Sequence, residues 1–176
     1  MLIVLTGPIG SGTSELACGL LKVFNNMVVL DCEWFATMQP FSWDKKSDIA
    51  IVYQAIAQMI SFYDKTGKTR FVITLTSQMA QYCQEFLPML NSKHMLVRAF
   101  RLRCSDEHLK QRIQNDKRLD ATIQINAFKQ QKWFDATFNT NMPFMVCDVT
   151  HLHEQEVVRK IRTMINDYDK LLKVNS

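Results

Sequence analysis

The chain has 176 residues, of which 47% are hydrophobic and 22% are charged. A chain of this length and composition can bury one sizeable core. Its formal net charge of +4 suits a small polyanionic ligand. No basic stripe is interleaved with aromatic residues, which argues against nucleic acid as a partner. No apolar run approaches the ~18 residues that cross a bilayer, so we expect no membrane partner.

The cysteines indicate a reducing compartment. Their odd number, their wide spacing and the lack of a Cys-x-x-Cys pair argue against a disulfide framework and favour buried thiols. No charged and then apolar leader precedes the first expected strand, so we expect a cytoplasmic protein. The five are Cys18, Cys32, Cys83, Cys104 and Cys147.

Short apolar runs alternate with segments of helical periodicity along the chain. The expected strands are 2–6, 27–30, 71–76, 95–102 and 144–149. The expected helices are 13–24, 48–65, 78–90, 105–133 and 153–172, with a loop at 37–47. This alternation predicts an α/β fold in which helices cover both faces of a five-stranded, mostly parallel sheet. We expect residues 1–176 to form a single domain.

A glycine-rich loop joins the first expected strand to the first expected helix. Three glycines let its backbone amides turn inward, and the helix start adds a positive dipole end, so phosphate is favoured there. Ser14 stands where a phosphate-binding P-loop places the hydroxyl that ligates Mg²⁺. The expected phosphate-binding residues are Gly7, Pro8, Ile9, Gly10, Ser11, Gly12, Thr13 and Ser14.

The loop lacks the lysine of the P-loop motif, because Thr13 occupies its position, so the Walker A motif is degenerate. The missing ammonium group would bridge the β- and γ-phosphates, and in a water-poor site we value it at about 3 kcal/mol. Phosphate binding survives that loss more readily than catalysis does. Two other interpretations are a tight chain reversal without a ligand and a dinucleotide-binding loop. The latter needs a third glycine where Glu15 or Thr13 stands.

Beyond the loop, the order of features resembles small P-loop kinases of the shikimate, gluconate and chloramphenicol phosphotransferase group, related in fold to nucleoside monophosphate kinases. Asp31 ends the second strand, where these enzymes often carry an acceptor-binding carboxylate. Residues 100–112 look like the strand, turn and helix that lead into their lid. Thr150 follows a strand end similar to the one beneath their adenine. The resemblance implies a three-layer P-loop NTPase fold with a small helical lid at about 112–132, using ATP or another nucleoside triphosphate with Mg²⁺.

The carboxylates after the second strand are candidates for the chemistry. An acceptor hydroxyl needs a carboxylate that orients it and accepts its proton, and Asp31 is the predicted catalytic base. Glu33 is the alternative, or serves Mg²⁺ through water. The competing interpretation is that Asp31 only caps the turn that leaves the strand.

The cationic residues of the expected lid are candidates for stabilising the transferred phosphoryl group. Arg112 and Arg118 fit that role, and the alternative is a solvated helical face. Lys117 is a hypothetical substitute for the missing loop lysine. Ser105 is expected to cap a helix, so the acidic residues that follow it need no catalytic task.

Two classes of function follow. The first is an ATP-dependent phosphotransferase that acts on a small hydroxylated or nucleotide-like acceptor. The second is a catalytically silent relative that binds a nucleotide, a phosphorylated ligand or a protein partner. In a third version, a basic residue from the lid or another subunit restores activity. Four aromatic residues would stack on a planar acceptor or close the core beneath a loop: Trp34, Phe35, Phe41 and Trp43.

Overall fold

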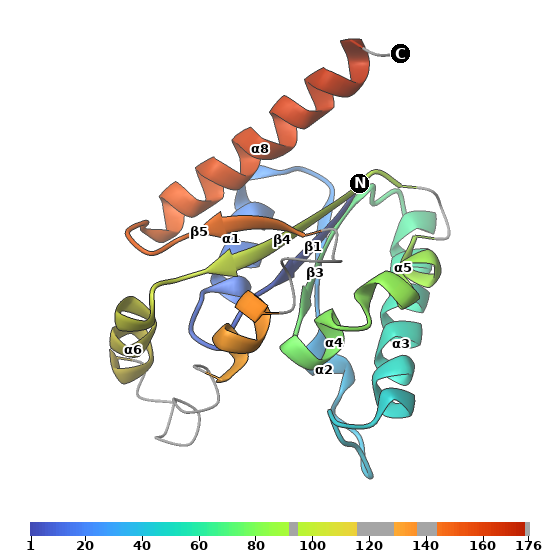
Figure 1. Cartoon of the computed structure of the whole chain (residues 1–176). Coiled ribbons are helices and arrows are strands. Elements are labelled where there is room, and N and C mark those ends of the chain that lie inside the picture. Colours follow the sequence, from blue (N-terminus) through green and yellow to red (C-terminus); the bar gives the residue numbers. More distant parts are fainter. Residues whose placement is uncertain (92–94, 116–128, 137–143, 175–176) are drawn as a thin grey trace.

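Five parallel strands form one sheet with the spatial order β2-β3-β1-β4-β5 (Figure 1). The computed structural model describes the chain except residues 92–94, 116–128, 137–143 and 175–176, with side chains to residue 166. The sheet confirms the predicted α/β class. The strands are β1 (Leu2–Thr6), β2 (Met27–Asp31), β3 (Arg70–Leu75), β4 (Val97–Arg103) and β5 (Met145–Asp148).

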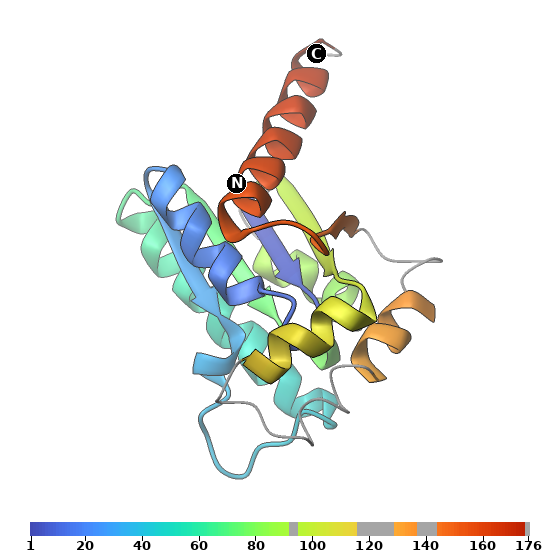
Figure 2. The same ribbon diagram turned by 90° about the vertical axis from the view of Figure 1, so that its left-hand side faces the viewer.

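Helices cover both faces of the sheet, which makes three layers. They are α1 (Thr13–Val23), α2 (Cys32–Phe35), α3 (Lys46–Lys65), α4 (Ser77–Ala80), α5 (Cys83–Leu90), α6 (Asp106–Asn115) and α8 (Glu154–Val174), and residues 129–136 are also helical. Figure 2 shows α1 and α8 on the near face, with α3 beyond the sheet. Within the described part of the chain, each helix is too short or too polar to cross a bilayer.

The central strand β1 contributes side chains to the hydrophobic cores on both faces of the sheet, because successive side chains of a strand point to opposite faces. Leu2 and Val4 join the core beneath α3 and α5, whereas Ile3 and Leu5 join the core beneath α1 and α8. All four side chains have no exposed surface. Burying each contributes about 1.5–3 kcal/mol, so the strand from which the glycine-rich loop emerges is held from both sides.

All five predicted strands are confirmed, with ends that differ by at most two residues. The predicted helix 78–90 is instead two helices, because α4 ends in a tight turn in which the Tyr82 amide donates to the Met79 carbonyl at 2.9 Å. Thr76 caps the start of α4 by accepting a hydrogen bond from the Met79 amide. The predicted helix 105–133 is also interrupted, since α6 ends at Asn115 and helical structure resumes at residue 129. The predicted cap at Ser105 is confirmed by a hydrogen bond of 3.3 Å from the His108 amide.

The helical segment 129–136 is anchored to the end of β4. Arg101, 1% exposed, donates to Asp135 with 2.5 Å between Nη2 and Oδ1. Gln131 donates from Nε2 to the carbonyl of Cys104, and Phe134 is fully buried. The predicted lid at 112–132 therefore starts in α6 and ends in an anchored helix, and its middle lies outside the described residues.

Candidate functional site: a glycine-rich loop beside a cleft

The loop between β1 and α1 needs glycine for two reasons. Gly10 and Gly12 have φ angles of +84° and +93°, in the left-handed region that side chains disfavour. A Cβ atom on Gly10 would lie 2.8 Å from Cγ1 of Ile113 in α6. The loop closes through a turn in which the Ser11 amide donates to the Pro8 carbonyl at 3.0 Å.

Most amides of the loop are available to a ligand. The backbone N–H groups of Gly10, Gly12, Thr13 and Ser14 make no hydrogen bond to a described residue. Such orphan donors at a helix start, together with the helix dipole, favour an anion. The Ser11 hydroxyl is buried next to Gly7 and has no partner among the described residues. The loop therefore has the chemistry of a phosphate cradle.

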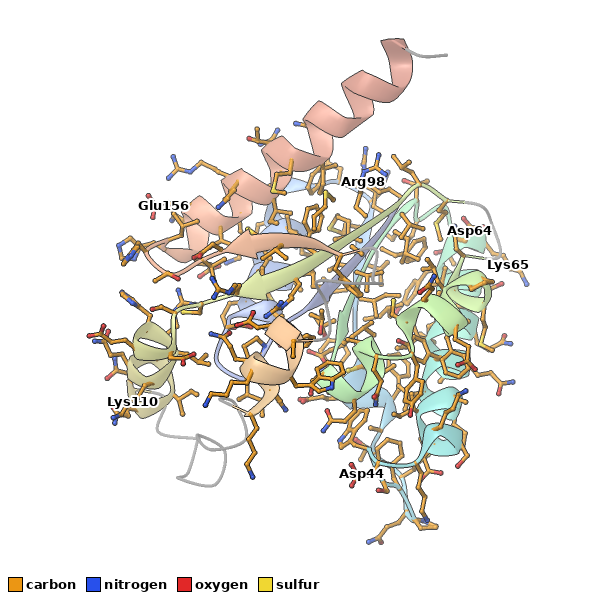
Figure 3. All side chains as sticks on the ribbon, in the orientation of Figure 1. Asp44, Asp64, Lys65, Arg98, Lys110 and Glu156 are labelled. Atoms are coloured by element: carbon orange, nitrogen blue, oxygen red, sulfur yellow. The ribbon has the colours of Figure 1, made fainter. Side chains whose placement is uncertain are left out.

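A cleft of about 1230 Å³ opens beside this loop. It exceeds the ~300–1000 Å³ typical of a single small-molecule site, so there is room for two ligands. Its walls include the ends of β2 and β3, with Asp31, Glu33 and Thr74, and the loop before α3, with Asp44. Figure 3 shows Asp44 at the opposite end of the molecule from Arg98, which lies near the start of β4. The cleft thus lies at the carboxyl ends of the strands, the usual ligand site of open α/β sheets.

Asp31 has two hydrogen bonds in the cleft. Its Oδ2 accepts from the Ser14 hydroxyl at 3.2 Å, and its Oδ1 accepts from the Glu33 amide at 3.1 Å. The second bond caps α2, and the cap leaves Oδ2 to the Ser14 hydroxyl, so capping and a role in the site remain compatible. The bond from Ser14 joins the hydroxyl oxygen that the sequence predicts as an Mg²⁺ ligand to the carboxylate that it predicts as the acceptor's base. Partial burial, and then the negative charge of Asp31, raise the pKa of Glu33 above its ordinary value.

Arg112 lies beside the loop and is held by backbone carbonyls. Its Nη1 donates to Ser11 at 3.2 Å, and its Nη2 donates to Val149 at 3.3 Å and to Leu152 at 3.2 Å. The guanidinium group therefore joins the glycine-rich loop to the segment after β5. The sequence predicted Arg112 at the site, and the structure places it in the cleft wall. Arg118 and Lys117 lie outside the described residues.

Thr150 contacts the start of α6. Its hydroxyl accepts from the Ser105 amide at 2.9 Å, and its own amide donates to Asp148 at 2.9 Å. It does not line the cleft, whereas Leu152 two residues later does. A contact between Thr150 and adenine stays a prediction.

Of the four aromatic residues near the expected acceptor side, Trp43 lines the cleft. Its ring meets Phe41 edge to face at 4.8 Å, and both pack on the core. Trp34 is 67% exposed. Sequence reasoning missed Trp133, which also lines the cleft, because segment 129–136 lies about 120 residues after the loop and carries no motif.

Carboxylates outnumber cations in the described wall of the cleft. Arg112 and Lys129 are the basic residues there, and the acidic residues are Glu15, Asp31, Glu33, Asp44 and Glu154. A polyanion in such a cleft needs further positive charge. Mg²⁺ usually takes one or two carboxylates together with phosphate oxygens and water. Ser14 and Asp31, at 3.2 Å, offer that kind of hard oxygen pair.

The sheet order, the loop and the cleft define the fold of the small P-loop kinases, the class that the sequence resembles. The structure is similar to a gluconokinase from Sinorhizobium meliloti, with a TM-score of 0.69, 13% identity, and coverage of 99% of this chain and 96% of that one. A shikimate kinase from Bacteroides thetaiotaomicron gives 0.65 and 12%, covering 94% and 98%. A deoxyadenosine kinase from M. mycoides gives 0.54 and 15%, covering 95% and 100%. No protein-family model and no curated protein matches the sequence.

The residues present fit a nucleoside triphosphate and Mg²⁺. The free amides of the loop suit phosphate, and the buried hydroxyls of Ser11 and Thr74 lack partners among the described residues. Ser14 and Asp31 suit the cation. The missing element is a lysine at position 13.

Proposed function

We propose that this chain is an ATP-dependent phosphotransferase that transfers a phosphoryl group to a small hydroxylated or nucleotide-like acceptor. The observation that supports it most is the set of unbonded loop amides next to the Ser14–Asp31 pair, at the mouth of a cleft large enough for two ligands. The loop amides would hold the phosphates, and Ser14 with Asp31 would hold Mg²⁺. The bound nucleotide supplies the phosphoryl group.

The two carboxylates at the junction of β2 and α2, Asp31 and Glu33, divide the remaining tasks in this proposal. Asp31 orients the acceptor hydroxyl and serves the cation. Glu33 lines the same cleft, and in this proposal it takes the proton of the acceptor hydroxyl, the role for which the sequence offers it as the alternative to Asp31. Arg112 keeps the glycine-rich loop in place through its bond to the Ser11 carbonyl. Arg118 stays a proposed catalytic residue of the lid.

Two observations favour a silent nucleotide-binding protein instead. Thr13 replaces the motif lysine, and the Ile9 amide donates to Gln130 Oε1 at 3.1 Å rather than facing a ligand. In that version the fold binds nucleotide without transferring phosphate. Both versions require the loop to bind phosphate.

Calorimetric titration with ATP and Mg²⁺, paired with an assay of phosphoryl transfer to a panel of sugars, hydroxy acids and nucleosides, separates them. Binding with acceptor-dependent turnover supports the kinase, and binding without turnover supports the silent protein. Absence of any binding to ATP or inorganic tripolyphosphate would refute both.

Two variants test the division of tasks. Asp31→Asn keeps a good cap for α2 but removes a charge next to Ser14, so we expect the Mg²⁺ requirement to rise. Glu33→Gln should lower turnover by about 100-fold and leave ATP affinity unchanged, because it removes the proton acceptor. Equal effects of both variants on ATP affinity and turnover would contradict separate roles.

A further inference from the structure

Position 13 of the glycine-rich loop lacks a lysine, but another element of the cleft wall carries one. Lys129 begins the helical segment 129–136, and it lines the same cleft as Thr13 and the rest of the glycine-rich loop. It is exposed and makes no salt bridge with a described residue. Its ammonium group is therefore available to a ligand.

The neighbouring residue fixes where this segment meets the loop. The carboxamide oxygen of Gln130 accepts a hydrogen bond from the Ile9 amide, with 3.1 Å between the two atoms. Ile9 lies in the loop itself, between Gly7 and Gly10. One residue along the chain separates this contact from Lys129, so the start of the segment lies against the cradle.

The rest of the segment is held from behind. Asp135 bonds both Arg101 and Arg103 of β4, at 2.5 Å and 3.3 Å. Gln131 donates to Asp106 Oδ1 at 3.2 Å, and Phe134 is fully buried in the core beneath α3. These contacts position Lys129 by a packed helix rather than by a loose loop, which lowers the entropic cost of holding a ligand.

Arg112, the other cation of the described wall, is less suited to this task. Three of its hydrogen-bond donors already meet carbonyls of Ser11, Val149 and Leu152. Moving the guanidinium onto a terminal phosphate would break those bonds. A lysine ammonium on a flexible stem has no such cost.

We propose that Lys129 supplies, from a separate element of the cleft wall, the positive charge to the β- and γ-phosphates that position 13 lacks. This inference rests on the proposed nucleotide binding and adds the residue that completes the phosphate site. It places the compensating cation on the anchored end of the lid region. The charge then reaches the phosphates from a different element than in a complete P-loop.

The test compares Lys129→Met with Lys132→Met in the full chain. Lys132 belongs to the same segment and is also exposed, but it does not line the cleft. Affinities for ATP, inorganic tripolyphosphate and AMP are measured by calorimetry with Mg²⁺ present, and urea unfolding checks that both variants fold. Because one charge-assisted hydrogen bond is lost, we expect Lys129→Met to weaken ATP and tripolyphosphate binding about tenfold.

The same change should leave AMP binding within about twofold, because AMP lacks the outer phosphates, and Lys132→Met should leave all three unchanged. Lys129→Arg should keep most of the affinity. Recovery of ATP affinity when Thr13→Lys is added to Lys129→Met would support the inference that Lys129 replaces the lysine missing from position 13. Equal ATP affinities of the two methionine variants, or an equal loss for AMP, would overturn the inference while the proposed function stands. A native chain that binds neither ATP nor tripolyphosphate would refute the proposed function first.

Discussion

Replacement of Gly10 by alanine tests the geometry of the phosphate cradle. The φ angle of +84° places alanine in the left-handed region, which costs about 1–2 kcal/mol. The new Cβ would also lie 2.8 Å from Cγ1 of Ile113, a methylene group packed in the core, and such overpacking costs about 1–3 kcal/mol. We therefore expect Gly10→Ala to lower the free energy of unfolding by about 2–5 kcal/mol.

Gly67 offers a matched control. Its φ angle is +86°, and no atom lies within 4 Å of the Cβ position, so Gly67→Ala carries the backbone cost alone. Urea unfolding of both variants, compared at equal m-values, gives the difference directly. We expect about 1–3 kcal/mol between them, which is the steric part. Equal losses would refute the contact with Ile113, and a neutral Gly10→Ala would refute the left-handed loop.

Two further predictions concern the contacts that hold the cleft in place. A Cβ atom on Gly19 of α1 would lie 2.4 Å from Val158 Cγ2 of α8, so Gly19→Ala should destabilise the fold by about 1 kcal/mol despite better helix propensity. Val158→Ala should relieve that clash, and a stabilising Gly19→Ala in urea unfolding would contradict it. Desolvation opposes ionisation of Asp135, but Arg101 outweighs it and holds the pKa below its ordinary value of 3.8. The stability advantage of the native chain over Asp135→Asn should thus be full above about pH 5 and fall as the pH drops through the folded pKa. An advantage that does not change between about pH 6 and pH 2 would contradict this.

The sheet was predictable because each of its strands is a short apolar run that does not show the spacing of an amphipathic helix. The run at 2–6 is apolar at nearly every position, as expected for a strand buried on both faces. The predicted helix at 78–90 was wrong in part, since α4 begins after Thr76 and α5 begins after Tyr82, although their combined apolar spacing resembles that of one helix. The spacing of apolar residues shows which side chains face the core, but it does not show where the backbone hydrogen bonds of a helix are interrupted.

The site was predictable where a local motif carries it. The loop at 7–14 directly follows β1 and Asp31 is the last residue of β2, and ligands of such sheets bind at strand ends. Lys129 and Trp133 were not predictable, because they reach the cleft through the packing of segment 129–136 on β4. Nothing in their neighbouring residues records that contact, which depends on the Arg101–Asp135 pair.

The central position of β1 has a consequence for the timing of backbone opening. Its five residues are completely buried, and both of its edges are bonded, to β3 and β4. We expect the amide protons of such a strand to exchange with solvent only when the core opens. The glycine-rich loop begins directly after this strand, so its first peptide is tethered to a segment that we expect to open late.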